Sequence, residues 1–282
     1  MQWMKLGLPR LGIVVLSLVF TGMVYLMAAE KTADELRKGA QQSFKEGNFG
    51  DAYTSLRKLV VDPANKGNQL YDDLQLAVTC LQRLTRQFEI DSLLKDVIDA
   101  HQDDWSAYFA AARVLSGVEH YGFIVAGEFS RGSQRGGGAF VDVSERDRAQ
   151  GLIWLETARQ KMPDSVNGPE KAEFYSIFAH QLRQNSGNAW KMQQLTDLTT
   201  LPDYPEPQQR GRFFGFRGSR GSGDAQGAPV DADGNPVFYS LPESFEAAKN
   251  DGERWRWCLQ QIAEFDAARL NESRYRLAHF LH

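Results

Sequence analysis

A glycine-rich stretch near the middle of the chain constrains the fold more than any other feature. Six glycines lie between Gly122 and Gly138. Each glycine inside a helix costs roughly 1 kcal/mol relative to alanine, so this stretch cannot be helical. Glycine at this density indicates backbone that turns sharply or that is approached closely. The sequence therefore predicts two helical regions, 30–120 and 144–201, joined by a glycine-rich connector over 121–143.

The connector has an apolar half and a glycine half, and these predict different surroundings. Its apolar side chains are expected to anchor it in the helical core: Phe123, Ile124, Val125 and Phe129. Arg131 and Arg135 are expected at the rim, paired with acids of the flanking helices. The favoured interpretation is a packed irregular loop. The alternative is an anion site formed by Arg131, Arg135 and nearby backbone amides, since such groups attract anions.

The N-terminal leader contains Lys5 and Arg10, followed by an apolar run over 11–29. A basic segment before an apolar one is typical of an export signal. The run is also long enough to cross a bilayer as a helix. Residues 1–29 are therefore predicted to be a signal peptide or a membrane anchor. With either a signal peptide or an anchor, the rest of the chain is expected outside the cytoplasm, because the basic residues before the apolar run stay inside. The chain would then be periplasmic, secreted, or anchored in the inner membrane and facing outward.

The segment after the leader has the pattern of two antiparallel helices. Ala40 and Ala52 are small enough to let the helices approach, and Gly47 makes the turn between them. Pro63 stops the second helix. The spacing is close to that of a tetratricopeptide unit, although the proline arrives one residue early. Because one helix pair cannot bury its apolar face alone, the sequence predicts a tetratricopeptide-like array over 30–120.

The region 144–201 is also predicted to be helical. Ser144 and Asp147 have the spacing of a capping box, which opens a helix. Gly168 followed by proline starts a second helix, because proline is favoured at the first helical position. Prolines from Pro202 onward break the helical run.

A Pro/Gly/Arg-rich insertion is predicted over 202–242. It holds no acidic residue between Glu206 and Asp224. Four of its arginines are candidates for contact with a partner or an anion: Arg210, Arg212, Arg217 and Arg220. A surface loop is the favoured interpretation. A small β-hairpin is expected around Gly234, and C-terminal helices are expected over 243–282.

Composition and motifs exclude several functional classes. The net charge of -4 argues against a nucleic-acid binder, which normally carries a basic surplus. Neither Gly-x-Ser-x-Gly nor His-Glu-x-x-His occurs, so no catalytic residue, metal ligand or cofactor is assigned. Cys80 and Cys258 are expected to be free, buried thiols. A single bridge between them stays open, because the leader indicates an oxidising compartment.

Two stretches carry a family resemblance. The first is Tyr-Gly-Phe-Ile-Val-Ala-Gly-Glu-Phe-Ser-Arg-Gly over 121–132, followed by Arg135 with three glycines and by Glu-Arg-Asp-Arg over 145–148. The second runs over 244–258. Together they resemble the N-terminal helical region of large bacterial, planctomycete-type α-macroglobulin-like proteins, over most of the chain after the leader.

The resemblance implies an exported, multidomain chain associated with trapping proteases, in which a helical region precedes β-sandwich domains. This sequence contains neither those sandwiches nor a recognisable bait region. Cys258 and Gln261 have the spacing of the thioester found in that family. The flanking glycines that a strained thioester turn needs are missing, so the spacing is expected to be a coincidence.

The sequence as a whole predicts an all-α protein with Gly/Arg-rich insertions and one small β-hairpin. Its expected function is that of a non-enzymatic, extracytoplasmic scaffold that binds a protein partner. One alternative is an envelope hydrolase with an unrecognised site, and another is an anion- or glycan-binding module acting through the Arg/Gly loops. A catalyst needs a pocket with converging titratable groups, whereas a scaffold needs only a groove.

Overall fold

The computed structural model describes residues 32–133, 136–184, 192–206, 231–235 and 237–281. Several sequence-based predictions concern residues outside this part of the chain: the leader, Arg135, Arg210, Arg212, Arg217 and Arg220. None of the described helices is long and apolar enough to cross a membrane.

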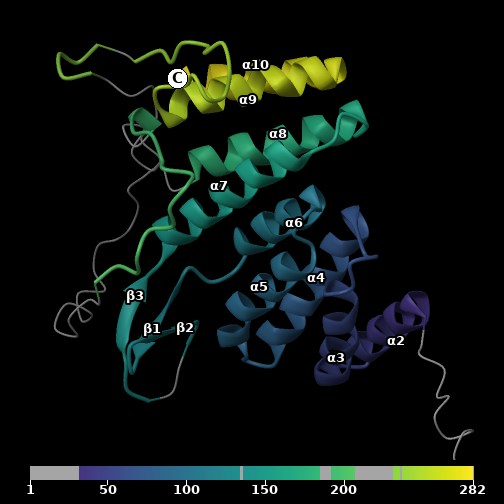
Figure 1. The fold of residues 1–282 in the computed structure, drawn as a ribbon. Coiled ribbons are helices and arrows are strands. Elements are labelled where there is room, and N and C mark those ends of the chain that lie inside the picture. The colour runs from purple at the N-terminus through teal and green to yellow at the C-terminus, as the bar shows by residue number, and fades with distance from the viewer. Residues whose placement is uncertain (1–31, 134–135, 185–191, 207–230, 236, 282) are drawn as a thin grey trace, which may run out of the picture.

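The described chain is predominantly α-helical, as the sequence predicts, with one small sheet (Figure 1). The helices are α2 (Ala33–Lys45), α3 (Phe49–Val60), α4 (Gly67–Arg83), α5 (Ile90–Ala100), α6 (Trp105–Leu115), α7 (Ser144–Lys161), α8 (Gly168–Arg183), α9 (Asp251–Phe265) and α10 (Leu270–Leu281). A short 3-10 turn, η1 (Gln87–Glu89), precedes α5. The strands are β1 (Tyr121–Val125), β2 (Glu128–Arg131) and β3 (Ala139–Asp142).

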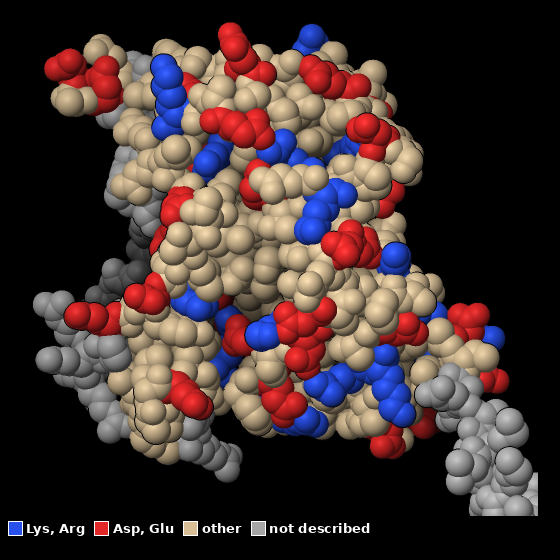
Figure 2. Space-filling view, in the orientation of Figure 1, with Lys and Arg blue, Asp and Glu red and all other residues tan. Residues whose placement is uncertain are grey.

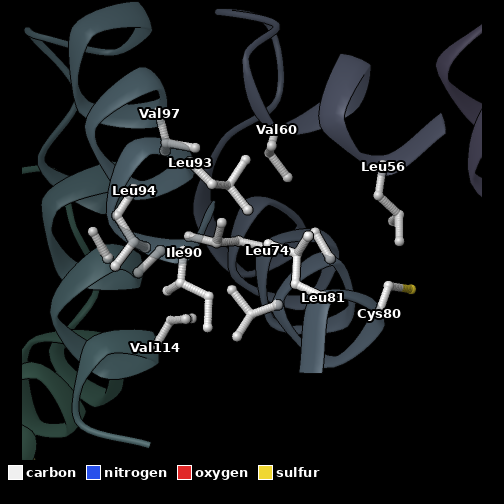
Figure 3. Close-up of a cluster of buried hydrophobic side chains, with 14 of the residues drawn as sticks. Leu56, Val60, Leu74, Cys80, Leu81, Ile90, Leu93, Leu94, Val97 and Val114 are labelled. Carbon is white, nitrogen blue, oxygen red and sulfur yellow. The ribbon is translucent and has the colours of Figure 1, made fainter. Parts of the chain in front are cut away.

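The first hydrophobic core lies among α2 to α6. Ala40 and Ala52 are fully buried where α2 and α3 pack together, and Gly47 closes the turn between these helices with a φ of +81°. Figure 3 shows Leu74 and Leu81 of α4 converging with Leu93 and its neighbours on α5. Burying each such side chain stabilises the fold by about 1.5–3 kcal/mol. The predicted close contact of the first two helices is confirmed.

A second core lies among α7 to α10 and is rich in aromatic side chains. Phe174 and Phe178 of α8 meet Trp255 and Cys258 of α9 in this cluster, and all four are buried. Trp105 and Trp255 are both buried in this cluster. Figure 1 shows α9 and α10 side by side over α8.

Helix α6 joins the two cores. Nine of its eleven residues are buried, and their side chains are divided between the two cores. Ala110, Ala111 and Val114 belong to the first core, whereas Trp105 and Phe109 belong to the second. A helix that is apolar on all sides must be covered on all sides. The two cores therefore cannot separate without exposing α6.

The glycine-rich connector is a three-stranded antiparallel sheet in the order β2-β1-β3, so the prediction of an irregular loop is wrong. Strand β1 pairs with both neighbours, and Gly122 lies opposite Arg131. A Cβ atom at Gly122 would come within 2.2 Å of the Ser130 carbonyl oxygen, which explains the glycine. Ala126 and Gly127 turn the chain between β1 and β2 with φ values of 51° and 87°. Positive φ at both central residues is typical of a tight two-residue hairpin.

Two predictions about local structure after the connector are wrong. Helix α7 begins at Ser144, and its N-cap residue, Val143, makes no side-chain capping bond. The carboxylate of Asp142 accepts from the Ser144 amide at 2.9 Å, while Asp147 points to Arg131 instead of closing a capping box.

The predicted helical region over 144–201 also extends too far, because the described residues 192–206 contain no α-helix.

The predicted β-hairpin around Gly234 is a turn without strands in the part of the chain that the structure describes. The Gly234 amide donates to the Asp231 carbonyl at 3.0 Å, and the Asp231 amide donates to the Asn235 carbonyl at 2.9 Å. Residues 237–242 form no strand. The C-terminal helices begin at Asp251, eight residues later than the predicted start at 243, because Asn250 caps α9 through a bond from the Glu253 amide.

Candidate functional site

Arg131 is the one predicted site residue that lies within the described part of the chain. It ends β2, and only 2% of its surface is exposed, so it does not lie at the rim as predicted. Its guanidinium extends between α5 and α7, where Asp91 and Asp147 flank it. The predicted pairing of this arginine with acids of both helical regions is confirmed.

Every N–H group of the Arg131 guanidinium donates to an acceptor. Nε and Nη2 donate to Asp91 at 2.9 and 2.7 Å. Nη1 and Nη2 donate to Asp147 at 2.6 and 3.0 Å, and Nη1 also donates to the Glu119 carbonyl at 2.6 Å. A guanidinium has five N–H groups, so Arg131 has none left for an anionic partner.

His120 completes this ion cluster, with Nδ1 2.8 Å from a carboxylate oxygen of Asp147. Burial alone would raise the pKa of Asp147, but hydrogen bonds from His120 and Arg131 outweigh it and hold that pKa below its ordinary value. Burial would likewise lower the pKa of Arg131, but its bonds to Asp147 and Asp91 raise it instead. Both groups are therefore charged at neutral pH, and the cluster ties the sheet to α5 and α7.

A cleft of about 320 Å³ opens beside the ion cluster, between α5 and α7. On the face shown in Figure 2, a crevice runs between the sheet and α5, with charged side chains of both signs along it. One wall of the cleft is apolar and is formed by Leu94, Ile98, Leu115 and Trp154. The two carboxylates that line it, Asp91 and Asp147, are both bonded to Arg131.

Among the described residues that line this cleft, Arg146 of α7 is the cation without an ion pair. Its guanidinium carbon lies 3.9 Å from the ring centroid of Tyr204, and the Tyr204 ring stacks in turn on Phe129. The Nε of Arg146 is buried and has no acceptor among the described residues. Arg146 forms no ion pair there either, whereas Lys95, the other cation of the cleft, pairs with Asp99 on its own helix. An unpaired buried donor costs about 1–3 kcal/mol. An oxygen acceptor bound in the cleft at the Arg146 guanidinium would supply the ionic partner that this side chain lacks among the described residues.

Arg148 ties the same helix to the second core. Its Nη2 donates to Asp251 at 2.9 Å and to the Leu182 carbonyl at 3.0 Å. Sequence reasoning did not single out Arg146 or Arg148 as separate residues. The available signal was their position, because basic residues near a helix N-terminus oppose the helix dipole and so need tertiary partners.

The two cysteines are free and buried, as the favoured prediction had it. Burial raises the pKa of Cys80 to about 11 and raises the pKa of Cys258 well above its ordinary value. Cys258 lies within α9, and Gln261 lies on the same helix, so their spacing is that of consecutive helical turns. Neither thiol carries the low pKa of a reactive cysteine.

The cleft and the ion cluster come from separate parts of the chain: α5, the sheet, α7 and the segment that holds Tyr204. Among the described residues, no group of three or more His, Cys, Asp or Glu side chains is arranged to hold a metal ion. The chain matches no model of a known protein family, no curated protein and no solved structure.

Proposed function

We propose that this protein is a non-enzymatic, extracytoplasmic helical scaffold that binds a protein partner, and that the partner occupies the cleft between α5 and α7. The observation that carries the proposal is the Arg146 guanidinium, which forms no ion pair among the described residues and lines the cleft beside an apolar wall. A polypeptide segment supplies both groups that this site can accept. Its carbonyl or carboxylate oxygen meets Arg146, and its apolar side chain packs on Ile98 and Trp154, which line the cleft and are only half-buried.

The size and charge of the cleft support this kind of ligand. A volume of about 320 Å³ lies at the lower end of the range for ligand pockets, roughly 300–1,000 Å³. It suits a few side chains of an extended segment. The carboxylates of Asp91 and Asp147 are held by Arg131, and the pKa of Asp147 is lowered, which favours a structural role over proton transfer.

The finer parts of the proposal come from the sequence. The leader over 11–29 supports export or anchoring in a membrane. The resemblance to α-macroglobulin-like proteins supports a place at the front of a protease-trapping chain. The full burial of Ala40 and Ala52 supports a tetratricopeptide-like arrangement of α2 and α3.

Selection of random peptides displayed on phage, with the 282-residue chain as the target, tests the binding site. We expect the enriched peptides to combine an acidic residue with an apolar one. A hydrogen bond to a charged group contributes about 1.5–3 kcal/mol, so Arg146→Met should weaken their Kd about tenfold or more. The matched control is Arg57→Met, because Arg57 is an exposed arginine of α3.

Peptides that bind wild type and Arg146→Met equally well would place the partner elsewhere. The non-enzymatic part of the proposal is checked by mass spectrometry of the same peptides after prolonged incubation. Cleavage of a selected peptide by the wild-type chain would contradict it.

A further inference from the structure

A second hollow, of about 370 Å³, lies where α8 ends against α9 and α10. Helix α8 contributes His180 and Arg183 to its lining, α9 contributes Trp255 and α10 contributes Arg276. No acidic residue is among the described residues that line it. Three basic side chains from two helices therefore converge on one concave site.

The two arginines are held in position by other parts of the structure. Arg276 donates through Nη2 to the Ser176 hydroxyl at 2.8 Å and through Nη1 to the Ser176 carbonyl at 3.2 Å. Its Nη2 also lies 2.6 Å from Glu272, which offsets part of its charge from outside the hollow. The Arg183 guanidinium lies over the rings of Trp255 and Phe280, at 5.7 and 5.5 Å. Positioned donors bind a ligand without a further entropic cost of ordering them.

His180 lies in this hollow with a pKa below its ordinary value. The residue is exposed at the surface, but its imidazole is partly buried, and this burial is the largest cause of the lowered pKa. The positive charges of Arg276 and Arg183 lower the pKa further. Among the described residues, the charges that act on this pKa are those of Arg276 on α10 and Arg183 on α8. Glu272, also on α10, pairs with Arg276, and the lining residue of α9, Trp255, is uncharged. An anion in the hollow would favour the protonated imidazole and so reverse this shift.

Helix geometry alone does not explain the arrangement. The negative end of the α8 dipole favours cations in the last turn of this helix, which accounts for His180 and Arg183. It does not account for Arg276, which projects into the same hollow from the middle of α10.

We propose that this hollow binds a phosphate group, free or carried as a monoester, between His180, Arg183 and Arg276. A tetrahedral oxyanion presents acceptor oxygens in several directions, as three donors on two helices require, whereas a carboxylate presents two oxygens in one plane. This hollow is separate from the α5–α7 cleft, so the phosphate proposal and the partner-binding proposal can be tested independently.

Calorimetric titration of the 282-residue chain with inorganic phosphate and with phenyl phosphate, at constant ionic strength, tests the site. Acetate serves as the planar anion. We expect phosphate to bind more tightly than acetate, and Arg183→Met and His180→Gln each to weaken phosphate binding severalfold. The matched control is Arg274→Gln, because Arg274 is an exposed residue of α10 outside the hollow. Tighter binding of phenyl phosphate would identify a monoester as the ligand, and equal binding would identify free phosphate.

An NMR titration of His180 gives a second readout that does not depend on the fold tolerating Arg183→Met. The resonance is assigned with His180→Gln, and its pKa is measured with sulfate, which does not titrate in this range, and with chloride at matched ionic strength. We expect sulfate to raise the pKa of His180 by about one unit or more. An unchanged pKa, or phosphate binding that equals acetate binding and is insensitive to both substitutions, would overturn the proposal.

Discussion

Replacing Arg131 with alanine is expected to lower the free energy of unfolding by about 3–5 kcal/mol. The side chain is buried, and it is the shared partner of Asp91 and Asp147. Removing one partner of a buried ion pair is costly because it leaves an uncompensated buried charge. The Asp147 side chain is itself only 2% exposed, so water cannot replace the guanidinium without rearrangement.

Chemical denaturation of the wild-type protein and two variants measures this effect. The control is Arg57→Ala, which breaks an exposed pair with Asp96 and should cost under about 1 kcal/mol. If Arg131→Ala proved as stable as Arg57→Ala, Arg131 would be a surface residue, as the sequence predicted, and its role in joining the sheet to α5 and α7 would be lost.

Replacing Phe174 with alanine should have an effect of similar size, about 3–5 kcal/mol, through a different mechanism. Phe174 is fully buried, and its ring centroid lies 5.2 Å from that of Phe109 on α6 and 5.9 Å from that of Phe178 on α8. The substitution removes the aromatic contact between the joining helix and the second core and leaves a cavity that neighbouring helices can fill only in part.

Thermal unfolding of Phe174→Ala, compared with Phe238→Ala, checks this prediction. Phe238 is 65% exposed, so its replacement should change the free energy of unfolding by less than about 0.5 kcal/mol. Equal melting temperatures for the two variants would mean that α6 and α8 do not share a packed core.

The helices were predictable from the sequence because their signals are local. Asp104 caps α6, and Asn167 with proline starts α8, as residue type and spacing indicate. The sheet was not predictable in the same way. Its hairpin turns at Ala126 and Gly127, and alanine at positive φ is not a recognised turn signal. Glycine density excluded a helix but did not distinguish a sheet from a loop.

The burial of Arg131 could not be read from the sequence, because it depends on contacts between distant positions. Asp91 lies 40 residues earlier, and Asp147 lies 16 residues later. Only the packing of β2 between α5 and α7 brings the three together. The same holds for the cleft, since Ile98, Arg146 and Tyr204 come from three separate segments. A motif search along one chain contains no signal for such a site.

Hydrogen exchange of the 282-residue chain, with and without a selected peptide, tests the proposed partner site most directly. We expect the peptide to slow exchange at amides of α5 and of the first half of α7, where Arg146 lies, and to lose this effect in Arg146→Met. Protection confined to α2 and α3, or to α8 to α10, with none in α5 and α7, would contradict a partner-binding cleft at this position.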